Sequence, residues 1–457
     1  MRDAGFPDDF AWGVATSAYQ IEGAPAADGK GPSIWDRFTH EPGRILGGDT
    51  GDVACDHYHR WEEDVELLAR LGVDAYRFSI AWARVLPEGT GPVNPAGIGF
   101  YDRLVDALLE RGIEPMATLY HWDLPAALQD RGGWAERSTA DAFVEYAAAV
   151  TGALGDRIRT WITHNEPWVA AMLGYREGVF APGITDWRAA LAASHHLLLS
   201  HGQAVPVIRE HSPGARVGIA LDCRPSRPAS EDPAHVAARR HFDGFRNRWF
   251  FDPVFGKGYP EDMIDAYTAR GRIDPGGPAF VAAGDMETIA APVDFLGINY
   301  YTSLEVGVGG EESEDTGVPP SADPPPGHTE MGWRNTPGIL TRFLERVDEE
   351  WGPPSIMITE NGASYSDGPG EDGAVHDDRR IEYLREHIAA VAAARAAGVP
   401  VDGYFVWSLL DNFEWAQGYS QRFGLVWVDF ATGERIPKDS FHWYRRFITG
   451  ATPSLPG

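Results

Sequence analysis

Two glutamates occupy positions in this sequence that suit acid-base chemistry. Glu166 lies in the segment ITHNEP and Glu360 in MITENG, and each ends an apolar stretch that is typical of a β-strand. Cleavage of a glycosidic bond needs one carboxyl group to protonate the leaving oxygen and a second, ionised one to meet positive charge at the anomeric carbon. The pair therefore predicts a two-carboxylate hydrolase, provided that the fold brings two distant strand ends together.

Eight short β-rich stretches alternate with amphipathic helical patterns, which favours parallel strands. The predicted strands are residues 11–17, 75–80, 115–120, 159–166, 216–221, 295–301, 356–360 and 403–409, and the clearest helices are 62–70, 100–111, 140–154, 337–351 and 379–397. Eight such units predict a closed (β/α)8 TIM barrel of the α/β class, although an open doubly wound sheet has much the same local pattern. No GxGxxG or GxxxxGK[ST] fingerprint follows a strand, which disfavours a nucleotide-binding sheet.

The 457 residues contain no stretch that reads as a linker, so we expect residues 1–457 to form a single catalytic domain with extended βα loops. The segment 307–328 is acidic, rich in proline and poor in apolar residues. We predict a surface loop or lid over residues 307–333.

The polar residues near the predicted strand ends would meet on one face of a barrel, where active sites form. They are amides, carboxylates and aromatic residues, which suit a sugar, because planar polar groups bind vicinal hydroxyls and aromatic faces cover a pyranose ring. They are Gln20, Arg77, His121, Trp122, Asn165, Glu166, Asn299, Tyr300, Tyr301, Glu360, Trp407, Asp411, Glu414 and Trp415. Each alone also fits ordinary turn or core chemistry, so only the combination favours a sugar site.

Charge and composition narrow the possible partners. Thirty-nine basic against 67 acidic residues give a net charge of -28, which disfavours nucleic acid and acidic membranes and fits a neutral substrate. The N-terminus lacks a secretory pattern, no run of about 18 apolar residues occurs, and only two cysteines are present. We therefore expect a soluble, cytoplasmic protein without a membrane partner, and the oligomeric state stays open.

A metal site is the alternative that the histidines raise. Cys55, His57 and His59 have a C-x-H-x-H spacing, but no distant fourth ligand accompanies them. His195, His196 and His201 fall in a helical stretch, where exposed or satisfied buried histidines are expected. We predict neither a metal nor another cofactor.

Taken in order, the motifs resemble those of the β-glucosidases of glycoside hydrolase family 1, over almost the whole chain. The segments are FAWGVATSAYQIEG, TLYHWDLP, NEP, TENG and WSLLDNFEW. The resemblance implies a retaining β-glycosidase that removes terminal β-D-glucosyl residues from small β-glucosides or oligosaccharides through a covalent glycosyl-enzyme. Glu166 would be the acid/base and Glu360 the nucleophile.

The resemblance also implies roles around these carboxylates. Asn165 would bond the sugar 2-hydroxyl, Trp407 would stack beneath the ring, and Tyr301 would hydrogen-bond Glu360. The other implied residues are Gln20, His121, Glu414 and Trp415 at the remaining hydroxyls, Arg77 and Asn299 around the nucleophile, Trp122 in the pocket wall, and Trp168 and Trp333 on the aglycone side.

Physical chemistry assigns the same two roles. Glu360, beside cationic Arg77 and a tyrosine hydroxyl, should stay ionised, whereas the pKa of the less well paired Glu166 should be raised. A retaining pair should stand about 5 to 5.5 Å apart. The resemblance also implies that 6-phosphorylated sugars are excluded, because family members that act on them have a serine at the position of Glu414 and a lysine nearby. Glucosides, galactosides and fucosides stay open, as does transglycosylation. A binding protein on an inactive scaffold would lose one carboxylate, and both are present.

His164 departs from the family pattern, which has an apolar residue two positions before the acid/base. Regular strand alternation would place His164 and Glu166 on one side of the sheet. The histidine would then tune the pKa of Glu166; the alternative, which we favour, is that it packs outside the barrel with its own hydrogen bond.

Overall fold

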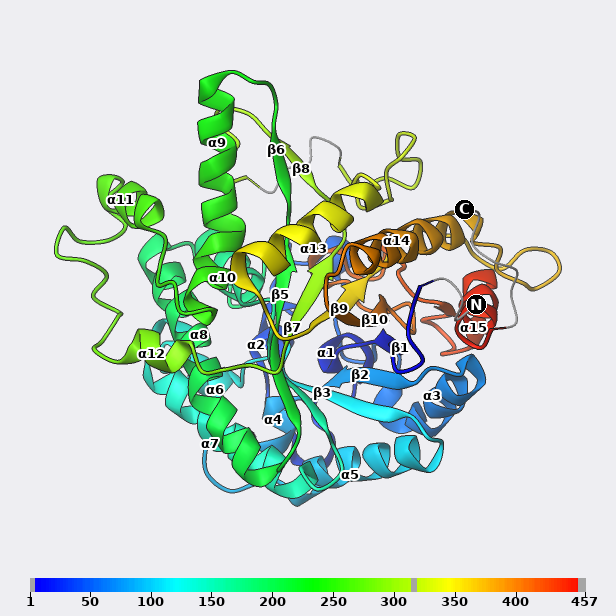
Figure 1. Ribbon diagram of the computed structural model, residues 1–457. Coiled ribbons are helices and arrows are strands. Elements are labelled where there is room, and N and C mark those ends of the chain that lie inside the picture. The colour runs from blue at the N-terminus through cyan, green and yellow to red at the C-terminus, as the bar shows by residue number, and fades with distance from the viewer. Residues whose placement is uncertain (1–4, 314–318, 451–457) are drawn as a thin grey trace.

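The computed structural model describes residues 5–313 and 319–450, and eight parallel strands close into a barrel at its centre (Figure 1). In barrel order they are β1 (Ala11–Ala15), β10 (Val401–Trp407), β9 (Ile356–Asn361), β7 (Phe295–Tyr300), β5 (Arg216–Cys223), β4 (Thr160–Asn165), β3 (Glu114–Tyr120) and β2 (Ala75–Ser79). All eight predicted strands are confirmed, and closure of the barrel rules out the open sheet.

Helices follow the strands and cover the outside of the barrel (Figure 1). The longer ones are α3 (His57–Leu71), α5 (Pro95–Glu110), α7 (Ser138–Leu154), α8 (Trp187–His211), α9 (Pro233–Asp243), α11 (Glu261–Ala269), α13 (Pro337–Trp351), α14 (Asp378–Ala396) and α15 (Asp439–Ile448). The short ones are α1 (Ala18–Ile21), α2 (Ile34–Phe38), α4 (Trp82–Val85), α6 (Ala126–Gln129), α10 (Trp249–Val254) and α12 (Asp285–Ile289). The five predicted helices are confirmed.

Local capping explains why α5 begins earlier than its apolar pattern does. Pro95 occupies the first turn, where its missing N–H costs nothing, and the side chain of Asn94 accepts from Ala96 N. The helix therefore starts at Pro95, five residues before the predicted start at Phe100.

The barrel interior is a packed core. It closes off the space beneath any site at the carboxyl ends of the strands. Its buried side chains come from the strands and include Ala15, Ala75, Met116, Ile162, Ala220, Phe295, Met357 and Phe405. A second and larger apolar layer lies between the strands and the surrounding helices. Polar chemistry is therefore confined to the carboxyl ends of the strands.

The loops carry two small sheets that the sequence patterns did not indicate. β6 (Ser226–Pro228) pairs in parallel with β8 (Leu304–Val306), and α9 stands beside them away from the barrel (Figure 1). β11 (Val426–Val428) pairs antiparallel with β12 (Arg435–Pro437). The described parts of the predicted loop, residues 307–313 and 319–333, contain no helix or strand. Their role as a lid stays a prediction.

A β-bulge in β4 decides where His164 lies. Ile162 pairs with Gly218 and Asn165 with Ala220, so β4 advances three residues while β5 advances two. His164 therefore faces outward, where its Nε2 lies 2.8 Å from Ser200 Oγ and its ring stacks on Phe143. The expectation that His164 and Glu166 share one side is wrong because of this bulge, and the packing interpretation is confirmed.

Candidate active site

Glu166 and Glu360 line one cavity at the top of the barrel. Glu166 follows the last residue of β4 and has a positive φ of 49°, and Glu360 lies in β9. β9 also carries a bulge, since Ile298 and Asn299 of β7 pair with Ile358 and Glu360. Both carboxylates thus follow a bulge, a feature that commonly redirects side chains next to active sites.

The two oxygens of Glu360 accept hydrogen bonds from different strands. Arg77 Nη1, from β2, donates to Oε1 over 2.7 Å, and the hydroxyl of Tyr301, after β7, donates to Oε2 over 2.6 Å. Arg77 is buried, and its guanidinium places a positive charge beside Glu360. These contacts favour the ionised form of Glu360.

Glu166 has a more weakly stabilised charge. Its Oε1 accepts from Asn299 Nδ2 over 2.7 Å, and the same Nδ2 donates to Asn165 Oδ1 over 2.9 Å. Asn165 Oδ1 also accepts from Arg77 Nη2 over 2.6 Å. One continuous network therefore joins the two carboxylates and fixes their relative orientation.

The surroundings set the pKa values of the two carboxyls apart. Burial raises the pKa of Glu166 well above its ordinary value, and the charges of Asp222 and Glu360 add to the rise. Burial also raises the pKa of Glu360, against the opposing effects of Arg77, Tyr301 and Asn299. The two pKa values therefore have the predicted order, and Glu166 keeps its proton to higher pH than Glu360 does. The charge of Arg77, however, does not bring the pKa of Glu360 below its ordinary value.

His121 offers a hydrogen-bond donor to the cavity. Burial and the charge of Arg77 lower the pKa of His121 well below its ordinary value, so the ring is neutral. Its Nε2 lies 3.1 Å from Asn165 Nδ2, which can only donate, and Nδ1 therefore carries the proton. Among the described residues Nδ1 has no partner, so it can donate to a ligand.

Glu414 lines the cavity, and Gln20 supports it from behind. Gln20 Nε2 donates to Asn412 Oδ1 and to the carbonyl of Phe413, and lies 3.4 Å from Glu414 Oε2. Gln20 is fully buried and is not part of the cavity wall, so its direct contact with a hydroxyl stays a prediction. Burial and the charge of Glu360 raise the pKa of Glu414 to about 8.

Aromatic rings form the rest of the predicted wall. Trp122 and Trp415 pack with ring centroids 4.5 Å apart, and the ring of His121 stacks against Trp407. The predicted site residues that line the cavity are His121, Trp122, Glu166, Trp168, Asn299, Tyr301, Trp333, Glu360, Trp407, Glu414 and Trp415. Arg77 and Asn165 lie behind this wall, within the network that joins the carboxylates.

One side of the cavity was missed by the sequence analysis. Asp222 and Cys223 end β5, and Asp222 forms an ion pair with Arg246, whose guanidinium lies 3.8 Å from the centroid of Trp168. The predicted fifth strand stopped at residue 221, just short of this polar end. The other unpredicted lining residues are Val169, Leu173, Phe180, Arg224, Thr302, Met331 and Phe423.

The candidate metal ligands point to separate partners. His57 Nδ1 lies 2.8 Å from Asp64 Oδ2, His59 contacts Asp56, and Cys55 Sγ donates to the carbonyl of Asp411. In the described ranges no group of three or more His, Cys, Asp or Glu side chains is placed to hold a metal ion. The histidines of α8, His195, His196 and His201, are buried and hydrogen-bonded, as predicted.

Among the residues that the structure describes, no helix has the length and apolar character needed to span a bilayer.

Comparison with known proteins places this site in a family. Residues 2–452 match the family described as Glycosyl hydrolase family 1. The chain is 48% identical to "Beta-glucosidase A" of Thermotoga maritima over 97% of both chains, and 45% identical to a "Bifunctional beta-D-glucosidase/beta-D-fucosidase" of Bifidobacterium breve over 97% of this chain and 98% of the relative. A solved structure of the Thermotoga maritima β-glucosidase in complex with deoxynojirimycin superposes with a TM-score of 0.91 at 48% identity, covering 98% of this chain and all of that one. On this similarity across nearly its whole length, the chain belongs to glycosyl hydrolase family 1, a family of retaining glycosidases.

Proposed function

We propose that this glycosidase hydrolyses terminal, non-reducing β-D-glucosyl residues and also accepts β-galactosides and β-fucosides. The observation that carries the proposal is the unequal pairing of two carboxyls in one cavity, with Arg77 and Tyr301 at Glu360 and an amide at Glu166. The names of the relatives, β-glucosidases and a glucosidase/fucosidase, support the choice of sugars.

In the first step Glu360 attacks the anomeric carbon while Glu166 gives its proton to the leaving oxygen. Arg77 and Tyr301 hold Glu360 by both of its oxygens, which aims the carboxylate and keeps it ionised before the attack. The C–O bond to the aglycone breaks, a covalent glycosyl-enzyme forms, and the aglycone leaves as a neutral alcohol.

In the second step the roles of the carboxyls reverse. Glu166, now ionised, takes a proton from water, and the resulting hydroxide attacks the anomeric carbon while Glu360 departs. Two inversions give net retention of configuration. The high pKa of Glu166, raised by burial and nearby charges, makes it a competent base once it has lost its proton.

The surrounding side chains form the sugar subsite in this proposal. His121 Nδ1 and the carboxyl group of Glu414 bind hydroxyls, with Gln20 orienting Glu414, and Trp407 forms the floor beneath the ring. Asn165 bonds the 2-hydroxyl through its amide. Trp122 and Trp415 close the wall, Asn299 orients Glu166, and Trp168 and Trp333 border the aglycone.

The proposal extends to the chain and its setting. Residues 1–457 act as one catalytic domain on small neutral β-glucosides such as cellobiose, in the cytoplasm, where the two free, buried cysteines would stay reduced. A single unfolding transition in calorimetry and recovery of activity in the cytosolic fraction of cells would support these two points. Several separate transitions, or activity in the culture medium, would contradict them.

NMR of the sugar released from 4-nitrophenyl β-glucoside tests the main proposal. The anomeric proton of β-glucose should appear first and that of α-glucose only later, by mutarotation. Early α-glucose would contradict retention, and no release from the glucoside, galactoside or fucoside would indicate a sugar-binding protein. Added methanol separates hydrolysis from transglycosylation, because a transglycosidase yields methyl β-glucoside in preference to glucose.

A further inference from the structure

A buried charge cluster lies behind the segment that carries one wall of the sugar pocket. This segment, residues 408–425, connects β10 to β11, and its side chains Glu414, Trp415 and Phe423 line the cavity. Asp411 points the other way, into the protein, where it is fully buried. The segment therefore has a pocket face and a charged inner face.

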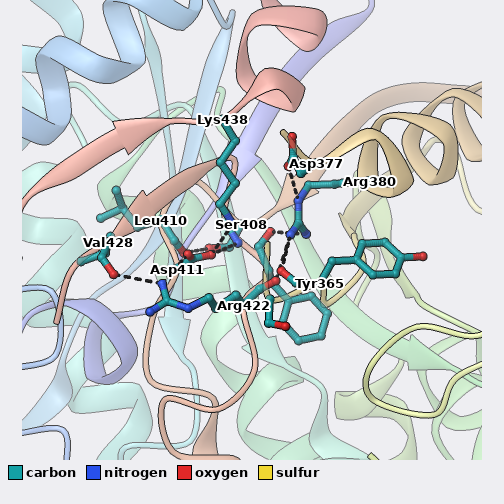
Figure 2. A network of polar contacts seen from close by, with 12 residues as sticks. Tyr365, Asp377, Arg380, Ser408, Leu410, Asp411, Arg422, Val428 and Lys438 are labelled. Carbon is teal, nitrogen blue, oxygen red and sulfur yellow. Dashed lines mark hydrogen bonds and ion pairs between the residues drawn. The ribbon is translucent and has the colours of Figure 1, made fainter. Parts of the chain in front are cut away.

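Asp411 accepts hydrogen bonds from three donors, two within residues 408–425 and one at the start of α15. Its Oδ1 accepts from Lys438 Nζ over 2.8 Å and from Gly424 N over 2.9 Å, and its Oδ2 accepts from Arg422 Nη1 over 2.8 Å. Figure 2 shows Lys438 and Arg422 meeting at this carboxylate from opposite sides. We call Asp411, Arg422 and Lys438 the Asp411 cluster.

The backbone around the cluster is held as tightly as its side chains. Lys438 N donates to the carbonyl of Leu425, Asp411 N to that of Val426, and Arg422 Nη1 also donates to the carbonyl of Val428. A Cβ on Gly424 would stand 2.1 Å from Asp411 N, so only glycine permits this approach. The two ends of the segment are thereby joined across Asp411.

A third cation, Arg380, contacts the same segment from α14. Arg380 is buried, its Nε donates to Asp377, and its Nη2 donates to the carbonyls of Tyr365 and Arg422 (Figure 2). Arg380 thus fixes the backbone next to Arg422, whereas Lys438 supplies the charge that meets Asp411 directly. Lys438 sits at the start of α15, so the last helix of the barrel is linked to the sugar pocket.

Burial makes this arrangement costly. Burial lowers the pKa of Lys438 to about 8, and Asp411 and Asp377 act against that decrease. A buried ion pair adds little net stability compared with apolar residues, whereas removing one partner leaves an uncompensated charge. Because such a cluster adds little net stability, its contribution lies in the orientation that it gives residues 408–425.

We infer that Lys438 and Asp411 are positioning residues that set the affinity of the pocket for the sugar, by holding residues 408–425 so that Glu414 and Trp415 face the cavity. The inference rests on the proposed function, in which Glu414 and Trp415 form part of the sugar subsite. The reacting carboxyls depend on the cluster far less, since Glu360 is held by Arg77 and Tyr301 from other strands.

Lys438→Met tests the inference through a split between KM and kcat. KM for 4-nitrophenyl β-glucoside should rise about tenfold, equivalent to roughly 1.4 kcal/mol, and kcat should change less than about threefold. The dissociation constant of glucose, measured by calorimetry, should rise in parallel. A fraction of unfolded protein lowers apparent kcat and leaves KM unchanged, so this readout separates positioning from simple loss of structure.

Three further variants make the comparison specific. Lys438→Arg keeps the positive charge and should recover most of the wild-type KM. Arg346→Met removes an ion pair with Asp243, between α13 and α9, that touches no residue of the segment, and it should leave KM unchanged. In the double variant Lys438→Met/Asp411→Asn, KM should rise by less than the product of the two single effects, since both changes break the Lys438–Asp411 contact and only Asp411→Asn also weakens the contact with Arg422.

If Lys438→Met does not fold, Arg422→Met replaces it, because that side chain is 18% exposed and lies at the outer edge of the cluster. A wild-type KM in the folded variant would overturn the inference, as would an equal rise in Arg346→Met. A wild type that neither cleaves the glucoside nor binds glucose would contradict the proposed function, and the inference with it. An active wild type with an unchanged cluster variant would contradict the inference alone.

Discussion

Arg77 Nη1 lies 2.7 Å from Glu360 Oε1, and both side chains are almost completely buried. The contact joins the second and the ninth strand of the chain, which are not neighbours in the barrel. It therefore depends on closure of the barrel, and it supplies the positive charge that opposes the effect of burial on the pKa of Glu360. In the proposed mechanism this cation acts before the reaction starts, by opposing protonation of Glu360 and aiming its carboxylate.

Arg77→Gln should move the acid limb of kcat/KM to higher pH. Loss of the cation raises the pKa of Glu360 further, and Glu360 reacts only when ionised, so activity should be lost earlier as pH falls. Removal of one partner of a buried pair also costs about 3–5 kcal/mol of stability. The pH profile and the melting temperature measure the two effects separately.

Arg77→Lys serves as the control for this prediction. Lysine keeps the charge but cannot make the hydrogen bond from Arg77 Nη2 to Asn165. The acid limb of this variant should therefore stay nearer to that of the wild type. An acid limb that does not move in Arg77→Gln would mean that Arg77 has no electrostatic role at Glu360.

Glu166→Ala should slow the enzyme by about 10²–10⁴-fold on substrates with poor leaving groups, because these need the proton of the general acid. Activated aryl glucosides should be affected much less in the first step. Azide should restore turnover and give a β-glycosyl azide, since it attacks the glycosyl-enzyme on Glu360 from the free face. Product NMR checks this, and an α-azide would transfer the nucleophile role to Glu166.

Strand ends were the most predictable part of the site, because parallel strands in a barrel share one catalytic face. The two glutamates and the residues at the ends of β3, β7 and β10 could therefore be placed from the sequence. β5 was the exception: its apolar pattern stops at Leu221, and Asp222 continues the strand because its backbone pairs with Asn299 of β7. Pairing with a neighbouring strand is not visible in the residues of one strand.

Bulges and long-range charge pairs were also beyond the sequence. Both catalytic strands insert one extra residue against a neighbour, and alternation alone predicted the wrong side for His164. Asp411 is one of the polar residues predicted near the strand ends, but its carboxylate faces Lys438 inside the protein. No local pattern links these two residues, since their contact forms only when α15 docks beside the segment that follows β10.

His164→Phe should leave the pH profile of kcat/KM unchanged, because His164 lies outside the barrel and burial lowers its pKa well below its ordinary value. The ring stacks on Phe143, so phenylalanine should fit with a loss of about 1 kcal/mol for the hydrogen bond to Ser200. Ser200 Oγ keeps its bond to the carbonyl of Leu197. The profile and a thermal melt check both expectations, and a shifted limb would revive a role in tuning Glu166.

Asp222→Asn should move the alkaline limb of kcat/KM to lower pH. The charge of Asp222 raises the pKa of Glu166, so removing it lowers that pKa. Glu166 must be protonated for the first step, and activity is then lost earlier as pH rises. Asp222→Glu, which keeps the charge, should retain the wild-type limb.

The ion pair with Arg246 is broken in the asparagine variant, and the freed cation would lower the pKa of Glu166 as well, in the same direction. Profiles of the wild type and the two variants on one glucoside with a poor leaving group, whose first step needs the proton of Glu166, decide the matter. Coincident alkaline limbs would show that Glu166 does not sense Asp222, and its high pKa would then rest on burial and on Glu360.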